Sequence, residues 1–172
     1  MESLDFNRLA SLIALTIVLA FAAYSEMTRK IIPNWLTLSG AACGIVLGYL
    51  PGGNTFLASL GGLAIGFGFL FAVYVFGGMG GGDVKLMGSA GALLGYPLII
   101  PTLFYTAVIG GVMAIICLVW KGDPWGRLKR MATRRKQADG APREQDAAAQ
   151  PLAIPYGIAI VSGCLMTMFF AL

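Results

Sequence analysis

The chain has 172 residues, of which 58% are hydrophobic and 12% are charged. Soluble domains carry roughly 25% charged residues, so the composition excludes an ordinary soluble protein and indicates one integral membrane domain over residues 1–172. The net charge of +4 does not indicate a nucleic-acid partner, because eight of the twelve basic residues lie between Lys121 and Arg143, in a loop flanked by apolar segments. The chain has no histidine, and its three cysteines form no CxxC pair, so we expect neither a metal site nor a cofactor.

Six apolar segments are expected to be membrane-spanning helices, since lipid leaves an open chain no other way to satisfy its backbone hydrogen bonds. The first, second and fourth are shorter than the ~20 residues of a full span, so either flanking residues extend them or the chain re-enters the membrane there. The start of the chain is not basic enough for a signal peptide, so we expect the first segment to remain a helix. The six segments are Leu9–Tyr24, Trp35–Leu50, Phe56–Phe76, Leu86–Ile100, Thr102–Trp120 and Leu152–Leu172.

The charges between these segments alternate. Basic residues occur in Ser25–Asn34, Gly77–Lys85 and Lys121–Gln150, whereas Pro51–Thr55 and Pro97–Pro101 are uncharged. By the positive-inside rule, the three basic loops face the cytoplasm and both termini lie outside. The longest of them, over residues 121–150, mixes charge with Ala, Gln, Gly and Pro and is predicted to be a flexible cytoplasmic loop.

Two carboxylates, Glu26 and Asp83, lie at the edges of apolar segments on this same cytoplasmic face. An ionisable group in that position is costly unless it has a use or a partner. Two carboxylates that face one another share a proton. The ionised one can then take a proton from water while the protonated one donates to a scissile carbonyl. This chemistry hydrolyses a peptide without metal or cofactor, and Glu26 and Asp83 are the pair placed for it.

Glycines surround Asp83 in the stretch GGMGGGDVKL. Without a Cβ atom, a glycine lets the backbone approach a substrate chain closely, so Gly80 and Gly82 are predicted to bind substrate. Lys85, two residues after the acid, is expected to tune it and to contribute to the same site. The residues alone leave another interpretation open, in which the stretch is a flexible turn and Asp83 is the N-cap of the next helix.

Three separated motifs resemble a known family. GGGD at Gly80–Asp83 resembles the Gly-x-Gly-Asp motif of intramembrane aspartic proteases. EMTRKIIPNWLTL at Glu26–Leu38 resembles a stretch of the type IV prepilin peptidases, and IPYG at Ile154–Gly157 resembles a motif of their last helix. The small size is similar to the short Flp/Tad subgroup, often called the CpaA or TadV type.

This resemblance implies a bundle of six transmembrane helices like that of the GxGD aspartic proteases, in the bacterial inner membrane. It implies removal of the leader peptide from Flp-type prepilins at the cytoplasmic face, with Asp83 as the second catalytic acid. Tyr156, within the last motif, is expected to contact the substrate or to pack at a helix break. The chain lacks the extra domain of larger relatives that also methylate the new N-terminus, so methylation is not expected. The resemblance leaves the oligomeric state open.

One position departs from the family pattern. The family has an aspartate seven residues before the proline of Ile-Pro-Asn, where this chain has Glu26. The extra methylene moves the carboxyl group by ~1 Å, and a misplacement of that size can cost ~10²-fold in rate. Three interpretations remain open: an active Glu/Asp peptidase, a homologue that binds prepilins or assembly proteins without cutting them, and a small transporter that uses both acids as a proton or cation site.

Overall fold

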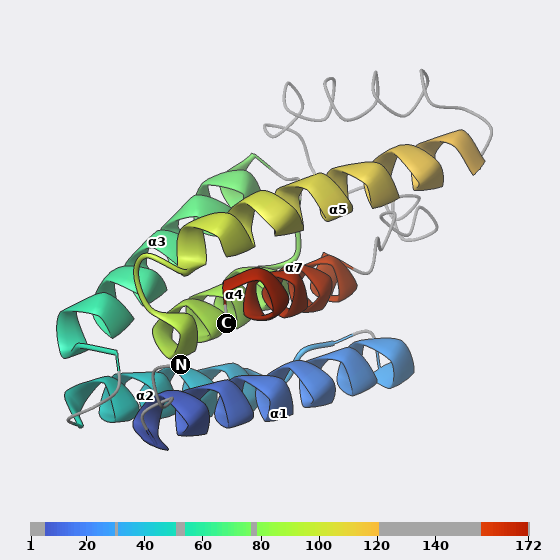
Figure 1. The fold of residues 1–172 in the computed structure, drawn as a ribbon. Helices are drawn as coiled ribbons and strands as arrows, with labels where there is room; N and C mark the ends of the chain where they lie inside the picture. Colours follow the sequence, from blue (N-terminus) through green and yellow to red (C-terminus); the bar gives the residue numbers. More distant parts are fainter. Residues whose placement is uncertain (1–5, 30, 51–53, 77–78, 121–155, 172) are drawn as a thin grey trace. The chain divides into compact units, whose positions relative to one another are not determined.

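A computed structural model describes residues 6–29, 31–50, 54–76, 79–120 and 156–171 (Figure 1). Within these ranges the chain is all-helical and has no strand, which confirms the predicted all-α class. The helices are α1 (Phe6–Arg29), α2 (Asn34–Tyr49), α3 (Phe56–Val75), α4 (Gly81–Leu94), α5 (Ile99–Trp120) and α7 (Tyr156–Ala171). The predicted loop Lys121–Gln150 lies outside the described residues.

The chain comprises two compact units. The first contains Met1–Gly110 and Pro155–Leu172, and the second contains Gly111–Ile154. Of the second unit, the structure describes the latter part of α5, residues 111–120. The candidate site residues named above all belong to the first unit, together with α1 to α4, the first half of α5, and α7.

The fourth predicted segment, Leu86–Ile100, is wrong at both ends. Helix α4 begins earlier, at Gly81, and ends at Leu94. Gly95 then adopts a φ of 74°, a left-handed conformation that glycine tolerates and other residues rarely adopt. The predicted uncharged turn at Pro97–Pro101 is shifted for the same reason: the turn covers residues 95–98, and Pro101 lies in the first turn of α5, where its missing N–H is not needed.

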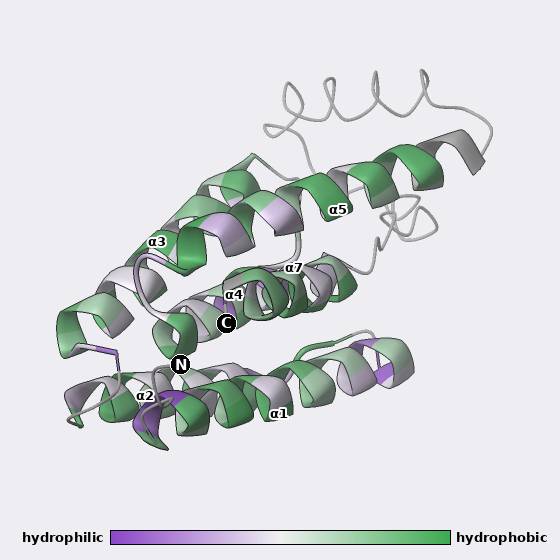
Figure 2. Cartoon of the chain, in the orientation of Figure 1, coloured by the Kyte–Doolittle hydropathy of each residue, from purple (hydrophilic) through white to green (hydrophobic). Residues whose placement is uncertain are grey.

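Among the residues that the structure describes, three helical stretches are long and apolar enough to cross a membrane: α1, α3, and residues Ile99–Ile116 of α5. Figure 2 shows that α1 is hydrophobic along its middle and hydrophilic at its two ends. Many large apolar side chains on these helices are exposed, among them Phe69 and Phe71 of α3. Such a surface is unfavourable in water, so it supports the interpretation of the chain as a membrane protein.

Helix α4 is the central helix of the first unit. It contacts α1, α2, α3 and α7, and eleven of its fourteen residues are buried. At 14 residues it is only ~21 Å long, shorter than the ~30 Å of a bilayer core. This length is tolerated because α4 packs against protein on nearly all sides. Its first turn carries Asp83, so the burial of α4 fixes the position of that acid.

Glycines allow the neighbouring helices to approach α4 closely. A Cβ atom on Gly62 of α3 would overlap the carbonyl oxygen of Gly91, and one on Gly91 would overlap that of Gly62. On the other side, a Cβ on Gly44 of α2 would lie 2.6 Å from the carbonyl carbon of Ala92. A Cβ on Gly66 of α3 would lie 2.8 Å from the carbonyl oxygen of Met87, so Gly62 and Gly66, four residues apart, both allow α3 to pack closely against α4.

Candidate active site

Glu26 lies near the end of α1, and its side chain reaches the beginning of α7. Its Oε1 accepts a hydrogen bond from the backbone N–H of Gly157 at 3.2 Å. The first N–H groups of a helix have no partner within the helix, and that end carries a partial positive charge. The start of α7 therefore stabilises the carboxylate of Glu26. The other oxygen, Oε2, is buried and has no hydrogen-bond partner within the described part of the chain.

Asp83 occupies the third position of α4, and Gly80 is the N-cap. The interpretation of Asp83 as the N-cap itself is therefore wrong. Its N–H donates to the carbonyl oxygen of Gly80 at 3.2 Å, and its carboxylate in turn interacts with the Gly80 backbone N–H. The contact of the Asp83 carboxylate with the N–H of the N-cap residue is one half of a capping box, the half that the side chain of the third helical residue supplies. The side chain is only 8% exposed, so Asp83 lies at a positive helix end in a largely buried position.

The structure brings the two acids together at one end of the first unit. The negative charge of Glu26 acts on Asp83, and Asp83 in turn acts on the hydroxyl of Tyr156. The carboxylate of each acid lies against the N-terminus of a helix: that of Glu26, which belongs to α1, contacts the start of α7, and that of Asp83 lies at the start of its own helix, α4. Two carboxylates held in this way can share one proton and act as an acid and a base.

Gly157 makes room for the glutamate side chain. A Cβ atom at position 157 would overlap Oε2 of Glu26 and would lie 2.9 Å from its carboxyl carbon. The sequence reasoning did not single out this residue as part of the site. The available signal was its place in the IPYG motif, next to Tyr156.

Tyr156 is the first residue of α7 and is partly buried. Its ring lies against Gly110 of α5, where a Cβ atom would be 2.5 Å from the ring carbon Cζ. Because Tyr156 also lies within electrostatic range of Asp83, it borders the acid pair and packs two helices together at the same time. Both expectations for Tyr156 are therefore compatible with its position.

The remaining predicted residues differ in their distance from the acids. Gly80 is exposed, and a Cβ atom there would lie 3.2 Å from Oδ2 of Asp83. Gly82 instead faces Ile32, in the segment before α2, at an ordinary contact distance of 3.4 Å from a Cβ atom. Lys85 donates through Nζ to Oδ1 of Asn34 at 2.9 Å, which links α4 to the beginning of α2. Of the described residues, no three His, Cys, Asp or Glu side chains gather in a way that could hold a metal ion.

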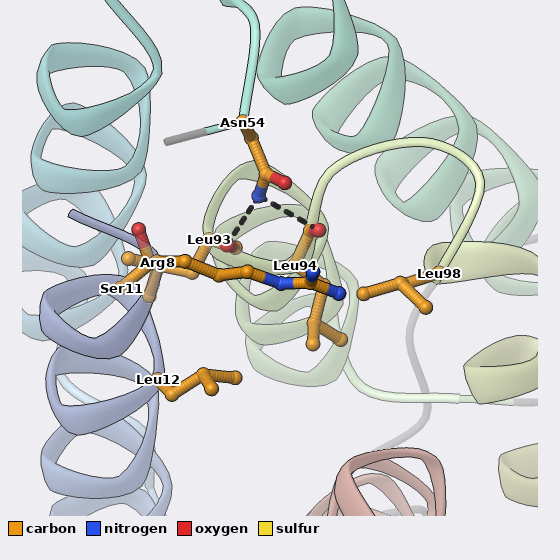
Figure 3. A pocket seen from close by; sticks show the side chains of 7 residues that line it. All are labelled: Arg8, Ser11, Leu12, Asn54, Leu93, Leu94 and Leu98. Carbon is orange, nitrogen blue, oxygen red and sulfur yellow. Dashed lines mark hydrogen bonds between the residues drawn. The ribbon is translucent and has the colours of Figure 1, made fainter. Parts of the chain in front are cut away.

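A small pocket lies far from the two acids, near the beginning of α1 and the end of α4 (Figure 3). There, Nδ2 of Asn54 donates to the carbonyl oxygens of Leu93 at 3.1 Å and Leu94 at 2.8 Å. These two carbonyl groups at the end of α4 thus gain a hydrogen-bond partner from outside the helix. Arg8, which lines this pocket, is 18 residues from Glu26 along α1, or ~27 Å. The pocket is thus separate from the candidate site. It is lined by Arg8, Ser11, Leu12, Asn54, Leu93, Leu94 and Leu98.

The model of the type IV leader peptidase family matches residues 13–115 of this chain. The matched region is more than half of the 172 residues and contains both Glu26 and Asp83. It ends before Tyr156 and Gly157, so the start of α7 lies outside the match. No curated protein and no solved structure matches the chain.

Proposed function

Because the chain belongs to the type IV leader peptidase family, we propose that it is a membrane aspartic endopeptidase that removes the leader peptide of prepilin-like substrates. We propose Flp-type prepilins as the substrates and the cytoplasmic membrane face as the place of cleavage. The observation that carries the proposal is the pairing of Glu26 and Asp83 from two different helices at one end of the first unit.

The reaction proposed for the pair is direct attack of water on the scissile peptide bond. The ionised acid takes a proton from the attacking water, and the protonated acid donates its proton to the carbonyl oxygen of the substrate. The tetrahedral intermediate then collapses, and the leaving amine receives a proton from the pair. Backbone N–H groups of Gly157 and Gly80 support one acid each, which keeps the two carboxylates in place without a metal ion.

The substrate is proposed to reach Asp83 from the side on which Gly80 is exposed. Gly80 is exposed beside this acid and has no side chain, so an extended peptide can approach the carboxylate closely. Tyr156 borders the acids from α7 and is proposed to contact the bound peptide. Gly82 and Lys85 are proposed to act indirectly, because they contact Ile32 and Asn34 in the segment that leads into α2.

For the topology, we propose six membrane-spanning helices in the bacterial inner membrane, with both termini outside and the acids facing the cytoplasm. The basic residues Arg29 and Lys85 follow Glu26 and Asp83 closely in sequence, so they lie at the same end as the two acids. By the positive-inside rule, this end is cytoplasmic. The short helices α2 and α7 are proposed to reach across with the residues that flank them. Helix α4 packs against α1, α2, α3 and α7, so it does not need to match the full thickness of the bilayer core.

The test is co-expression with a Flp-type prepilin and detection of leader removal on a gel. We compare the native chain with Glu26→Gln and Asp83→Asn, which keep the shape of each side chain but remove its charge. Glu2→Gln is the control, because it removes a carboxylate near the start of the chain. Cleavage is expected from the native chain and the control, and a loss of ~10²- to 10⁴-fold in both other variants.

Three outcomes contradict this proposal. If the native chain leaves intact a prepilin that a known Asp/Asp peptidase cleaves, the chain is a homologue that binds without cutting. If instead the chain conducts protons or cations in a way that needs both acids, and cleaves nothing, it is a transporter. If both Glu26→Gln and Asp83→Asn still cleave the prepilin, neither acid takes part in the reaction.

A further inference from the structure

We propose that Gly157 is a positioning residue for Glu26. The beginning of α7 forms a binding site for the carboxylate of the longer glutamate side chain and holds that carboxylate facing Asp83. Its catalytic consequence rests on the peptidase activity proposed above. The contact itself does not depend on that activity.

The first observation is the hydrogen bond across the bundle. Glu26 and Gly157 are 131 residues apart, and the N–H of Gly157 reaches Oε1 at 3.2 Å. This N–H belongs to the second residue of α7, where a backbone donor has no partner within its helix. The bond therefore uses a donor that would otherwise need water, and it fixes one of the two carboxylate oxygens.

The second observation is the space that Gly157 leaves. A Cβ atom there would overlap Oε2 of Glu26, which is buried against the backbone of α7. The overlapped atom is the far end of a flexible side chain, so an alanine at 157 pushes the carboxylate aside at little cost to the fold. The expected effect of Gly157→Ala is therefore on the position of the acid, and so on the rate.

A contrasting glycine lies on the same helix. A Cβ atom on Gly163 would overlap Oγ1 of Thr106 and would also lie 2.9 Å from the Thr106 backbone nitrogen. Because backbone cannot move aside as a side-chain tip can, Gly163→Ala is expected to loosen the packing of α5 against α7. The two variants thus separate a positioning effect from a packing effect on one helix.

The test is a double-mutant cycle on leader cleavage. Gly157→Ala is expected to reduce the rate ~10²-fold while leaving the Tm of the detergent-solubilised protein nearly unchanged. In the background of Glu26→Asp, whose shorter side chain does not reach position 157, the same change should alter the rate by no more than about twofold. Gly163→Ala should instead lower the Tm and should act equally in both backgrounds. Equal factors for Gly157→Ala in the two backgrounds overturn the proposal.

A second readout does not need peptidase activity. A hydrophobic carbodiimide labels protonated carboxyl groups, and peptide mass spectrometry reports the extent of labelling at Glu26. Gly157→Ala removes the fit that buries Oε2, so labelling of Glu26 is expected to rise several-fold, whereas Gly163→Ala leaves it unchanged. Unchanged labelling in Gly157→Ala overturns the contact. If the native chain cleaves no prepilin but labelling of Glu26 rises in Gly157→Ala, the proposed function is wrong and the contact between Gly157 and Glu26 is confirmed.

Discussion

The rate of leader cleavage by the Glu26→Asp variant shows whether the geometry of this site requires a glutamate at position 26. Aspartate is shorter by one C–C bond of ~1.5 Å, so its carboxylate retreats from α7 by ~1 Å or more. The distance from Oε1 to the N–H of Gly157 is already 3.2 Å, and the retreat takes it beyond hydrogen-bond range. The carboxylate then loses its hydrogen bond to the N–H of Gly157 in α7.

The expected loss follows from the value of that bond. A hydrogen bond to a charged group contributes about 1.5–3 kcal/mol, and each 1.36 kcal/mol of transition-state stabilisation is a factor of ten in rate. Glu26→Asp is therefore expected to reduce kcat/KM by about 10- to 150-fold, although aspartate is the residue that the related peptidases use. The assay is the initial rate of leader removal by purified protein in detergent, with Glu26→Gln as the inactive baseline.

A higher kcat/KM in Glu26→Asp than in the native chain would contradict a site that is built for glutamate. It would mean that the native carboxylate is badly placed, that the contact with Gly157 does not help catalysis, and that the chain is a weak relative of an Asp/Asp enzyme.

Two further predictions concern stability and are measured as the free energy of unfolding in detergent. Asn54→Ala removes both hydrogen bonds to the end of α4 and should lower the free energy of unfolding by about 1–3 kcal/mol. Asn34→Ala removes one exposed hydrogen bond to Lys85 and should lower it by well under ~1 kcal/mol. Equal losses in the two variants would contradict the capping role of Asn54. Gly91→Ala forces a Cβ atom into the backbone of α3 and should lower the free energy of unfolding by about 1–3 kcal/mol. A Cβ atom at Gly68 meets nothing within 4 Å, so Gly68→Ala should be neutral or slightly stabilising. An unchanged free energy of unfolding in Gly91→Ala would contradict the close packing of α3 against α4.

The helical class could be predicted because apolar composition and alternating charge are properties of whole segments. The sequence also indicated that Glu26 and Asp83 lie at the same end, since both belong to the basic loops Ser25–Asn34 and Gly77–Lys85. The end of α4 could not be predicted in this way. Residues 86–100 are apolar throughout, and the break depends on the left-handed conformation of one residue, Gly95.

The details of the candidate site depend on contacts that are distant in sequence. Asp83 was placed at a helix start, but its position as the third residue, with Gly80 as the cap, depends on where α4 begins. The contact between Glu26 and Gly157 joins the first and last described helices, and no local pattern encodes it. The IPYG motif marked the region without showing that its glycine faces an acid.

The central claim is that Glu26 and Asp83 together hydrolyse a leader peptide, and one measurement tests it most directly. Purified native protein and the Asp83→Asn variant are each incubated with a Flp-type prepilin in detergent, and the N-terminus of the product is identified by mass spectrometry. We expect a new N-terminus at the leader junction with the native chain and intact prepilin with the variant. Intact prepilin in both samples, while an established prepilin peptidase cleaves the same preparation, would contradict it.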